Sequence, residues 1–180
     1  TYPYQQIPFQ YSLHVVDSPG SKPKHISFLA EGSKDPRKEF LSSLKEALGS
    51  KGDIIVYNQG FEKARLNELA ELFPKEKKWV ESIFERVVDL LIPFRNFHYY
   101  NPKQKGSASI KDVLPAITGK DSYKKLDINN GEDASLQFIN MAFGDYTQQE
   151  KEETRENLEK YCALDTEAMI WIVDELREKI

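Results

Sequence analysis

The alternation of apolar and polar residues in the first third of the chain predicts a hairpin followed by a helix. From Phe9 to Val16 the apolar residues fall on every second position, which is typical of a strand with one wetter face. A turn at residues 17–20 and an apolar run over Ile26–Ala30 predict that a second strand folds back on the first. A helix is expected to begin at Asp35-Pro36, because proline is favoured in a first helical turn.

The middle of the chain predicts a buried strand and then mainly helices. Residues 53–58 form an apolar run between turn signals, which predicts a central strand covered on both faces. Helices are expected over about 61–73 and from about 75 onward, with the alternative that 87–92 is a short strand. Later helices are expected over about 110–117, 133–143 and 148–179. This order predicts an α/β fold with a mixed sheet flanked by helices.

Length and composition narrow the class of protein. The 180 residues are 39% hydrophobic and 12% aromatic, which predicts a single folded domain over residues 1–180. No apolar run approaches the roughly 20 residues that span a bilayer, and Cys162 alone cannot form an internal disulfide. We therefore expect a cytoplasmic protein. Because the sequence starts at Thr1 and not at methionine, we also expect a fragment of a longer protein.

The net charge is −4, but basic and aromatic residues are concentrated between residues 94 and 125. Cations that neutralise phosphates and rings that stack on bases are what a single-stranded nucleic acid requires. The alternative is a solvated loop with some buried rings, and for Asn58 it is a helix cap. The candidate nucleic-acid contacts are Asn58, Tyr99, Tyr100, Lys103, Lys105 and Lys111.

Two carboxylates lie on apolar helix faces. Asp165 shares a stripe of the last helix with Tyr161 and Met169, and an ionised carboxylate facing a core is costly unless it is paired or binds metal. Glu62 shares a stripe with Leu66 just beyond the predicted central strand, where sites form in open α/β sheets. The alternatives are a hydrogen-bonded Asp165 at the edge of the core and a Glu62 favoured by the helix dipole.

Other kinds of site find less support in the sequence. Asp89 is interpreted as a structural acid that anchors a turn. The three histidines do not cluster at the spacing of zinc ligands, and there is no phosphate-binding glycine loop or serine-type triad. Cys162 has no motif around it and is expected to be a small core residue.

The segment Asn58-x-x-Phe61-Glu62, followed much later by Tyr161-x-x-x-Asp165, resembles the second and third motifs of the DEDD 3′–5′ exonucleases, with tyrosine as in the DEDDy type. In residues 8–13, 57–62, 106–114 and 161–166 the chain also looks like a bacterial domain family of unknown function that is predicted to be exonuclease-like. These resemblances imply a ribonuclease H-like mixed sheet and a nucleic acid substrate. They imply two Mg²⁺ or Mn²⁺ ions that activate water and stabilise the transition state.

Carried over by position, Asp165 and Glu62 would be catalytic metal ligands, and Tyr161 would orient the water. The chain departs from the family in having Glu62 where aspartate is usual. Nothing acidic precedes Phe9, so the first Asp-x-Glu strand is missing. We therefore expect a fold that lacks its first strand, and a chain that is inactive alone. The alternatives are a non-catalytic nucleic-acid-binding module and a structural or interaction module.

Overall fold

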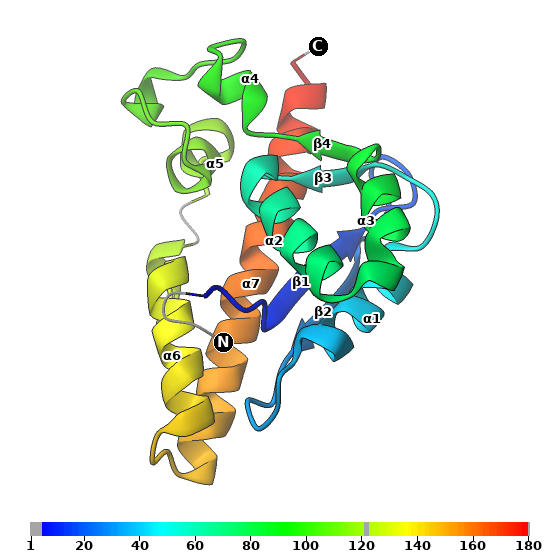
Figure 1. Ribbon diagram of the computed structural model, residues 1–180. Coiled ribbons are helices and arrows are strands. Elements are labelled where there is room, and N and C mark those ends of the chain that lie inside the picture. Colours follow the sequence, from blue (N-terminus) through cyan, green and yellow to red (C-terminus); the bar gives the residue numbers. More distant parts are fainter. Residues whose placement is uncertain (1–4, 121–122, 180) are drawn as a thin grey trace.

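The strands form two separate pairs in the computed structural model, which describes residues 5–120 and 123–179 (Figure 1). β1 (Gln10–Val15) and β2 (Lys24–Leu29) form an antiparallel hairpin with Leu13 opposite Ile26. β3 (Ile54–Val56) and β4 (Val87–Asp89) form a short parallel pair. Within the described residues, β1 and β3 each pair with one strand only. The expected α/β class is confirmed, but the expected single sheet is divided into two halves.

The helices follow the sequence expectation closely after residue 36. Four short segments, α4 (Ile92–Arg95) and three 3₁₀ turns (Pro74–Glu76, Pro102–Gln104 and Tyr123–Lys125), join the longer ones. The longer helices are α1 (Arg37–Leu48), α2 (Gln59–Leu72), α3 (Lys77–Phe84), α5 (Ile110–Thr118), α6 (Gly131–Phe143) and α7 (Gln148–Arg177). The described helices include none that is both long enough and apolar enough to cross a membrane.

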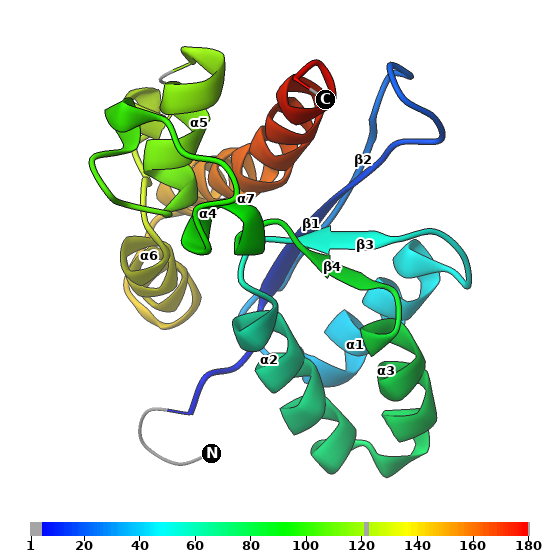
Figure 2. The same ribbon diagram turned by 90° about the horizontal axis from the view of Figure 1, so that it is seen from above.

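The hairpin separates two layers of helices (Figure 2). Tyr11 of β1 packs with buried residues of α1, α2 and α3, among them Phe40 and Leu69. The alternate β1 residues face α7, where the Gln10 side chain donates a 2.9 Å hydrogen bond to the Leu158 carbonyl. Because successive side chains of a strand point to opposite faces, one set of β1 side chains packs in the apolar core and the other set makes polar contacts with α7.

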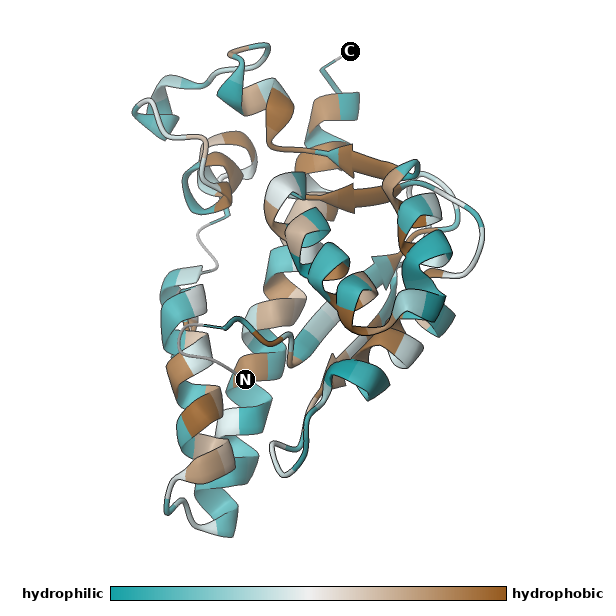
Figure 3. Ribbon diagram, in the orientation of Figure 1, coloured by the Kyte–Doolittle hydropathy of each residue, from teal (hydrophilic) through white to brown (hydrophobic). Residues whose placement is uncertain are grey.

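The long α7 contacts β1, α5 and α6, so it connects the hairpin to the rest of the molecule. Leu158 and Ile172 of α7 are fully buried. Figure 3 shows apolar residues along α6, and three of them are exposed to solvent. Its side chains Leu136, Ile139 and Phe143 are 55%, 51% and 76% exposed.

Arg86, just before β4, holds the loop between α1 and β3 in place through side-chain hydrogen bonds. Its guanidinium donates hydrogen bonds to the carbonyls of Leu48 at 3.0 Å, Gly49 at 2.9 Å and Gly52 at 2.8 Å. The last carbonyls of a helix lack partners within the helix, and a planar guanidinium can serve several of them at once. Arg86 thereby sets where β3 begins beside β4.

Two sequence expectations about the strands need correction. β3 is not covered on both faces, since Ile55 is 39% exposed and its partner Val88 is 48% exposed. The physical reason is that the described residues leave the face of the β3–β4 pair that carries Ile55 and Val88 largely open to solvent. The helix expected from about residue 75 ends at Phe84, and residues 87–89 adopt the strand that was the alternative.

Candidate carboxylate site

Asp165 lies at the centre of the candidate site, beside two tyrosine phenols. The Tyr123 hydroxyl donates a 2.6 Å hydrogen bond to Asp165 Oδ1. Tyr161, one helical turn earlier on α7, lies close enough to this carboxyl to lower its pKa. Lys111 lies near enough to favour its charged form, with Nζ 5.8 Å from the centre of the Tyr123 ring. Asp165 is thus a hydrogen-bonded carboxylate in a half-buried position.

Glu62, in the first turn of α2, lies near enough to Asp165 for the Asp165 charge to act on its carboxyl. By its accessible surface Glu62 is an exposed residue. The protein around its carboxyl nevertheless raises the pKa of this group, and repulsion from Asp165 raises that pKa further. Glu62 and Asp165, here called the carboxylate pair, come from helices that are far apart in the sequence.

The environment favours the protonated forms of the groups around the pair. Burial raises the pKa of Asp165, although Tyr123, Tyr161 and Lys111 act in the opposite direction. Burial and the Asp165 charge raise the pKa of the Tyr161 and Tyr123 hydroxyls, so both phenols stay protonated and act as donors. The pKa of the Cys162 thiol rises to about 12 through burial and the charges of Asp165 and Glu62, which leaves it unreactive at neutral pH.

The carboxylate pair is too small a ligand set for two metal ions. In residues 5–120 and 123–179, no three His, Cys, Asp or Glu side chains are grouped so that they could hold a metal ion. The two carboxylates supply oxygen ligands of the kind that Mg²⁺ prefers, but a pair of ions needs more ligands than these two side chains provide. The described residues therefore do not complete a two-metal site.

Asp89 is structural, as the sequence indicates. Its buried carboxylate accepts hydrogen bonds from the backbone N–H groups of Asn58, Gln59 and Leu91, each at 3.0 Å. Asn58 occupies the N-cap position of α2 with a positive φ of 83°, but its own side chain does not cap the helix. Asp89, from the adjacent strand, provides the hydrogen bonds that the first turn of α2 requires.

The candidate nucleic-acid residues divide into three places. Tyr99 is half-buried and packs edge-on against Phe94 at 5.9 Å between ring centres. Lys111 is at the carboxylate pair, where its Nζ donates to the Asn129 carbonyl. The exposed members are Asn58 beside Asp89, and Tyr100, Lys103 and Lys105 on the segment before α5.

Two features of the site region lie beyond what sequence spacing could find. Tyr123 falls within the basic and aromatic segment 94–125, and nothing in the sequence links it to an aspartate on another helix. His14 and His25 stack at 4.6 Å between ring centres, since the hairpin register places them opposite each other. Burial and the neighbouring His25 lower the pKa of His14, and its Nδ1 lies 2.7 Å from the Thr166 hydroxyl.

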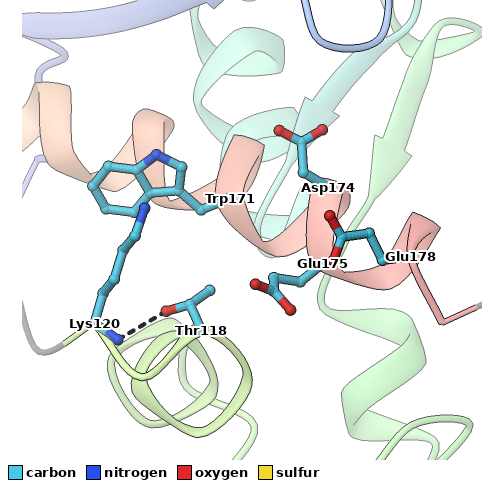
Figure 4. Close-up of a pocket in the computed structure, with 6 residues that line it drawn as sticks. All are labelled: Thr118, Lys120, Trp171, Asp174, Glu175 and Glu178. Atoms are coloured by element: carbon cyan, nitrogen blue, oxygen red, sulfur yellow. Dashed lines mark hydrogen bonds between the residues drawn. The ribbon is translucent and has the colours of Figure 1, made fainter.

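A hollow of about 190 Å³ lies elsewhere, between the end of α5 and the end of α7 (Figure 4). The Lys120 ammonium lies over the Trp171 ring, 3.9 Å from its centre, and the Lys120 backbone N–H donates to the Thr118 hydroxyl at 3.0 Å. The remaining lining residues are acidic, and Asp174 and Glu175 form ion pairs with Arg177, the last residue of α7, and with Lys179 just beyond it. This hollow does not include the carboxylate pair.

The chain belongs to the family described as a domain of unknown function, DUF2779, whose model matches residues 1–109. That match includes Glu62 but ends before Tyr161 and Asp165.

Three mycoplasmal relatives are similar over more of the chain. Uncharacterized protein UU173 of Ureaplasma parvum is 27% identical, over 94% of this chain and 27% of its own length. Uncharacterized protein MG366 homolog of Mycoplasma pneumoniae is 29% identical, over 94% of this chain and 28% of its own length. Uncharacterized protein MG366 of Mycoplasma genitalium is 29% identical, over 76% of this chain and 22% of its own length. The chain thus spans about a quarter of the length of these relatives, and no solved structure matches it.

Proposed function

We propose that this chain contributes two carboxylates and a positioning tyrosine to a metal-dependent 3′–5′ exonuclease with a ribonuclease H-like sheet. The carrying observation is that Glu62 of α2 lies near enough to Asp165 of α7, one helical turn from Tyr161, for the Asp165 charge to raise the pKa of the Glu62 carboxyl beyond the effect of burial. Two nearby carboxylates with raised pKa values favour either a shared proton or a bound cation. In the proposed enzyme, Mg²⁺ or Mn²⁺ supplies the opposing charge.

The two strand pairs support the ribonuclease H-like part of the proposal. β1 and β3 each have an edge without a partner among the described residues, and a two-stranded sheet is marginal by itself. One additional strand between β1 and β3 would unite the pairs into a five-stranded mixed sheet. We propose that another part of the polypeptide supplies this strand, together with the Asp-x-Glu carboxylates that the ligand set lacks.

The decisive test is hydrolysis of end-labelled oligonucleotides by the intact protein with Mn²⁺ or Mg²⁺. We expect Asp165→Asn and Glu62→Gln each to reduce the rate by about 100-fold or more, because removal of one metal ligand disturbs the stabilisation of developing charge. Asp174→Asn, an exposed carboxylate on the same α7, is the matched control and is expected to retain the rate. Hydrolysis that survives Asp165→Asn would exclude this site as the catalytic centre.

A non-catalytic nucleic-acid-binding module is the second candidate function. The observation in its favour is that the described residues hold only two carboxylates where the proposed reaction needs more. Binding by the intact protein that weakens with salt, without metal-dependent cleavage, would favour this second candidate.

A further inference from the structure

The aromatic residues at positions 94–100 divide into two that are packed inward and two that are exposed. Phe94 is 2% exposed and contacts Tyr99 edge-on, so both belong to the core beside α7. Phe97 and Tyr100, here called the aromatic platform, are 65% and 43% exposed. Their ring centres lie 5.6 Å apart with an angle of 50° between the planes. The structure therefore presents two neighbouring rings to solvent on an anchored segment.

The backbone at Phe97 adopts a conformation that large side chains disfavour. Its φ is 56°, in the left-handed region where glycine and asparagine are usual. Short-range hydrogen bonds hold the segment there, from Phe97 N–H to the Phe94 carbonyl at 3.2 Å and from Tyr99 N–H to the Pro93 carbonyl at 3.1 Å. Strain that exposes a large apolar ring does not improve packing, and such outliers are found at functional sites.

The charges around the aromatic platform are all of one sign in the sequence. Residues 90–111 contain no aspartate or glutamate, and Arg95, Lys103 and Lys105 are exposed. Lys111, at the end of this stretch, extends the positive charge to the neighbourhood of Asp165. The acidic end of α7 bounds this surface, since Lys179, which lies near Tyr99, pairs with Glu175. A polyanion with stackable bases matches both the cations and the exposed rings.

We propose that the aromatic platform stacks on the bases of a single-stranded nucleic acid whose phosphates run along Arg95, Lys103 and Lys105 toward the carboxylate pair. This deepens the proposed function, on which it rests, by naming the single-stranded form as the substrate. Bases in a duplex are already stacked on each other and present only their edges, so two exposed rings on one segment favour an unpaired strand. Phe97 replaces Tyr99 in the binding surface, and Tyr99 instead fixes the segment to the core.

The test measures binding of fluorescent single-stranded oligonucleotides, DNA and RNA, to the intact protein in EDTA. Phe97→Gly removes the ring and also suits the left-handed backbone, so it does not threaten folding. We expect Phe97→Gly and Tyr100→Ala each to weaken binding by about 10-fold. Lys103→Gln is expected to lower the slope of log affinity against log salt by about 1. Phe143→Ala, which removes an even more exposed ring from α6, is the matched control and is expected to bind as the wild type.

Several outcomes would overturn the proposal. These are wild-type affinity in Phe97→Gly, an equal loss in Phe143→Ala, equal affinity for a duplex of the same length, or absence of binding at low salt. Because EDTA removes any metal, the binding result is independent of cleavage. If binding depends on the aromatic platform but no hydrolysis occurs in Mn²⁺, the exonuclease proposal is rejected and the platform proposal stands. If hydrolysis occurs and Phe97→Gly does not change its rate, the platform proposal is rejected and the exonuclease proposal stands.

Discussion

At the scale of single residues, the carboxylate pair is an arrangement that lowers the stability of the folded state at neutral pH. Burial raises the pKa of both Glu62 and Asp165, and the Asp165 charge raises the pKa of Glu62 further. Between its ordinary value and a raised pKa, a carboxyl binds more protons in the folded state than in the unfolded state. The free energy of unfolding therefore falls as pH rises through that window. At neutral pH the pair lowers stability unless a cation is bound.

The variant Glu62→Gln tests whether the carboxylate pair destabilises the folded state at neutral pH. We expect the variant to unfold at a higher temperature than the wild type at pH 7 in EDTA, because a neutral amide removes the repulsion. The difference should shrink as the pH falls toward about 4, where an unfolded glutamate itself becomes protonated. Thermal unfolding across this pH range is the measurement, with Glu71→Gln on the same helix as the control. A variant less stable than the wild type at pH 7 would contradict the account.

At the scale of elements, Arg86 couples α1, the loop to β3 and β4 through one side chain. We expect Arg86→Lys to lower the free energy of unfolding by about 2 kcal/mol, because an ammonium cannot serve carbonyls spread across a planar fork. Urea unfolding followed by circular dichroism measures this change. Lys45→Arg on α1, whose ammonium forms a partly exposed pair with Glu76, is expected to change little. A loss in Arg86→Lys no greater than in that control would show that the contacts of Arg86 are dispensable.

The same scale shows how far sequence patterns reach. Most helix boundaries and the hairpin could be predicted because periodicity and caps are local, as at Ser109, whose hydroxyl caps α5. The end of α3 at Phe84 could not, because the apolar run continues into β4. The exposure of Ile55 could not be predicted from the sequence, because it depends on which other elements pack beside β3. The outward turn of Phe97 and the inward turn of Tyr99 also escaped prediction, since this loop has no period. Glu62 and Asp165 were singled out as carboxylates on apolar faces, but their proximity is a product of tertiary packing.

At the scale of the whole molecule, the two strand pairs predict that a longer form of the polypeptide is better ordered. If an additional strand enters between β1 and β3, the free edges of both gain backbone hydrogen bonds. We expect amides of β1 and β3 to exchange hydrogen more slowly in a protein extended at its N-terminus than in residues 1–180. Amides of α6 serve as the internal reference. Equal exchange in both forms would contradict the inserted strand.

The position of α7 has a consequence for synthesis on the ribosome. The polar face of β1 meets α7, and Asp165 lies on that helix, so both contacts wait until α7 itself has been translated. A nascent chain that stops before α7 has Glu62 without Asp165 and a hairpin with one uncovered side. A truncated product of translation is therefore an incomplete fold with half of the carboxylate pair, exposed to the quality-control machinery of the cell.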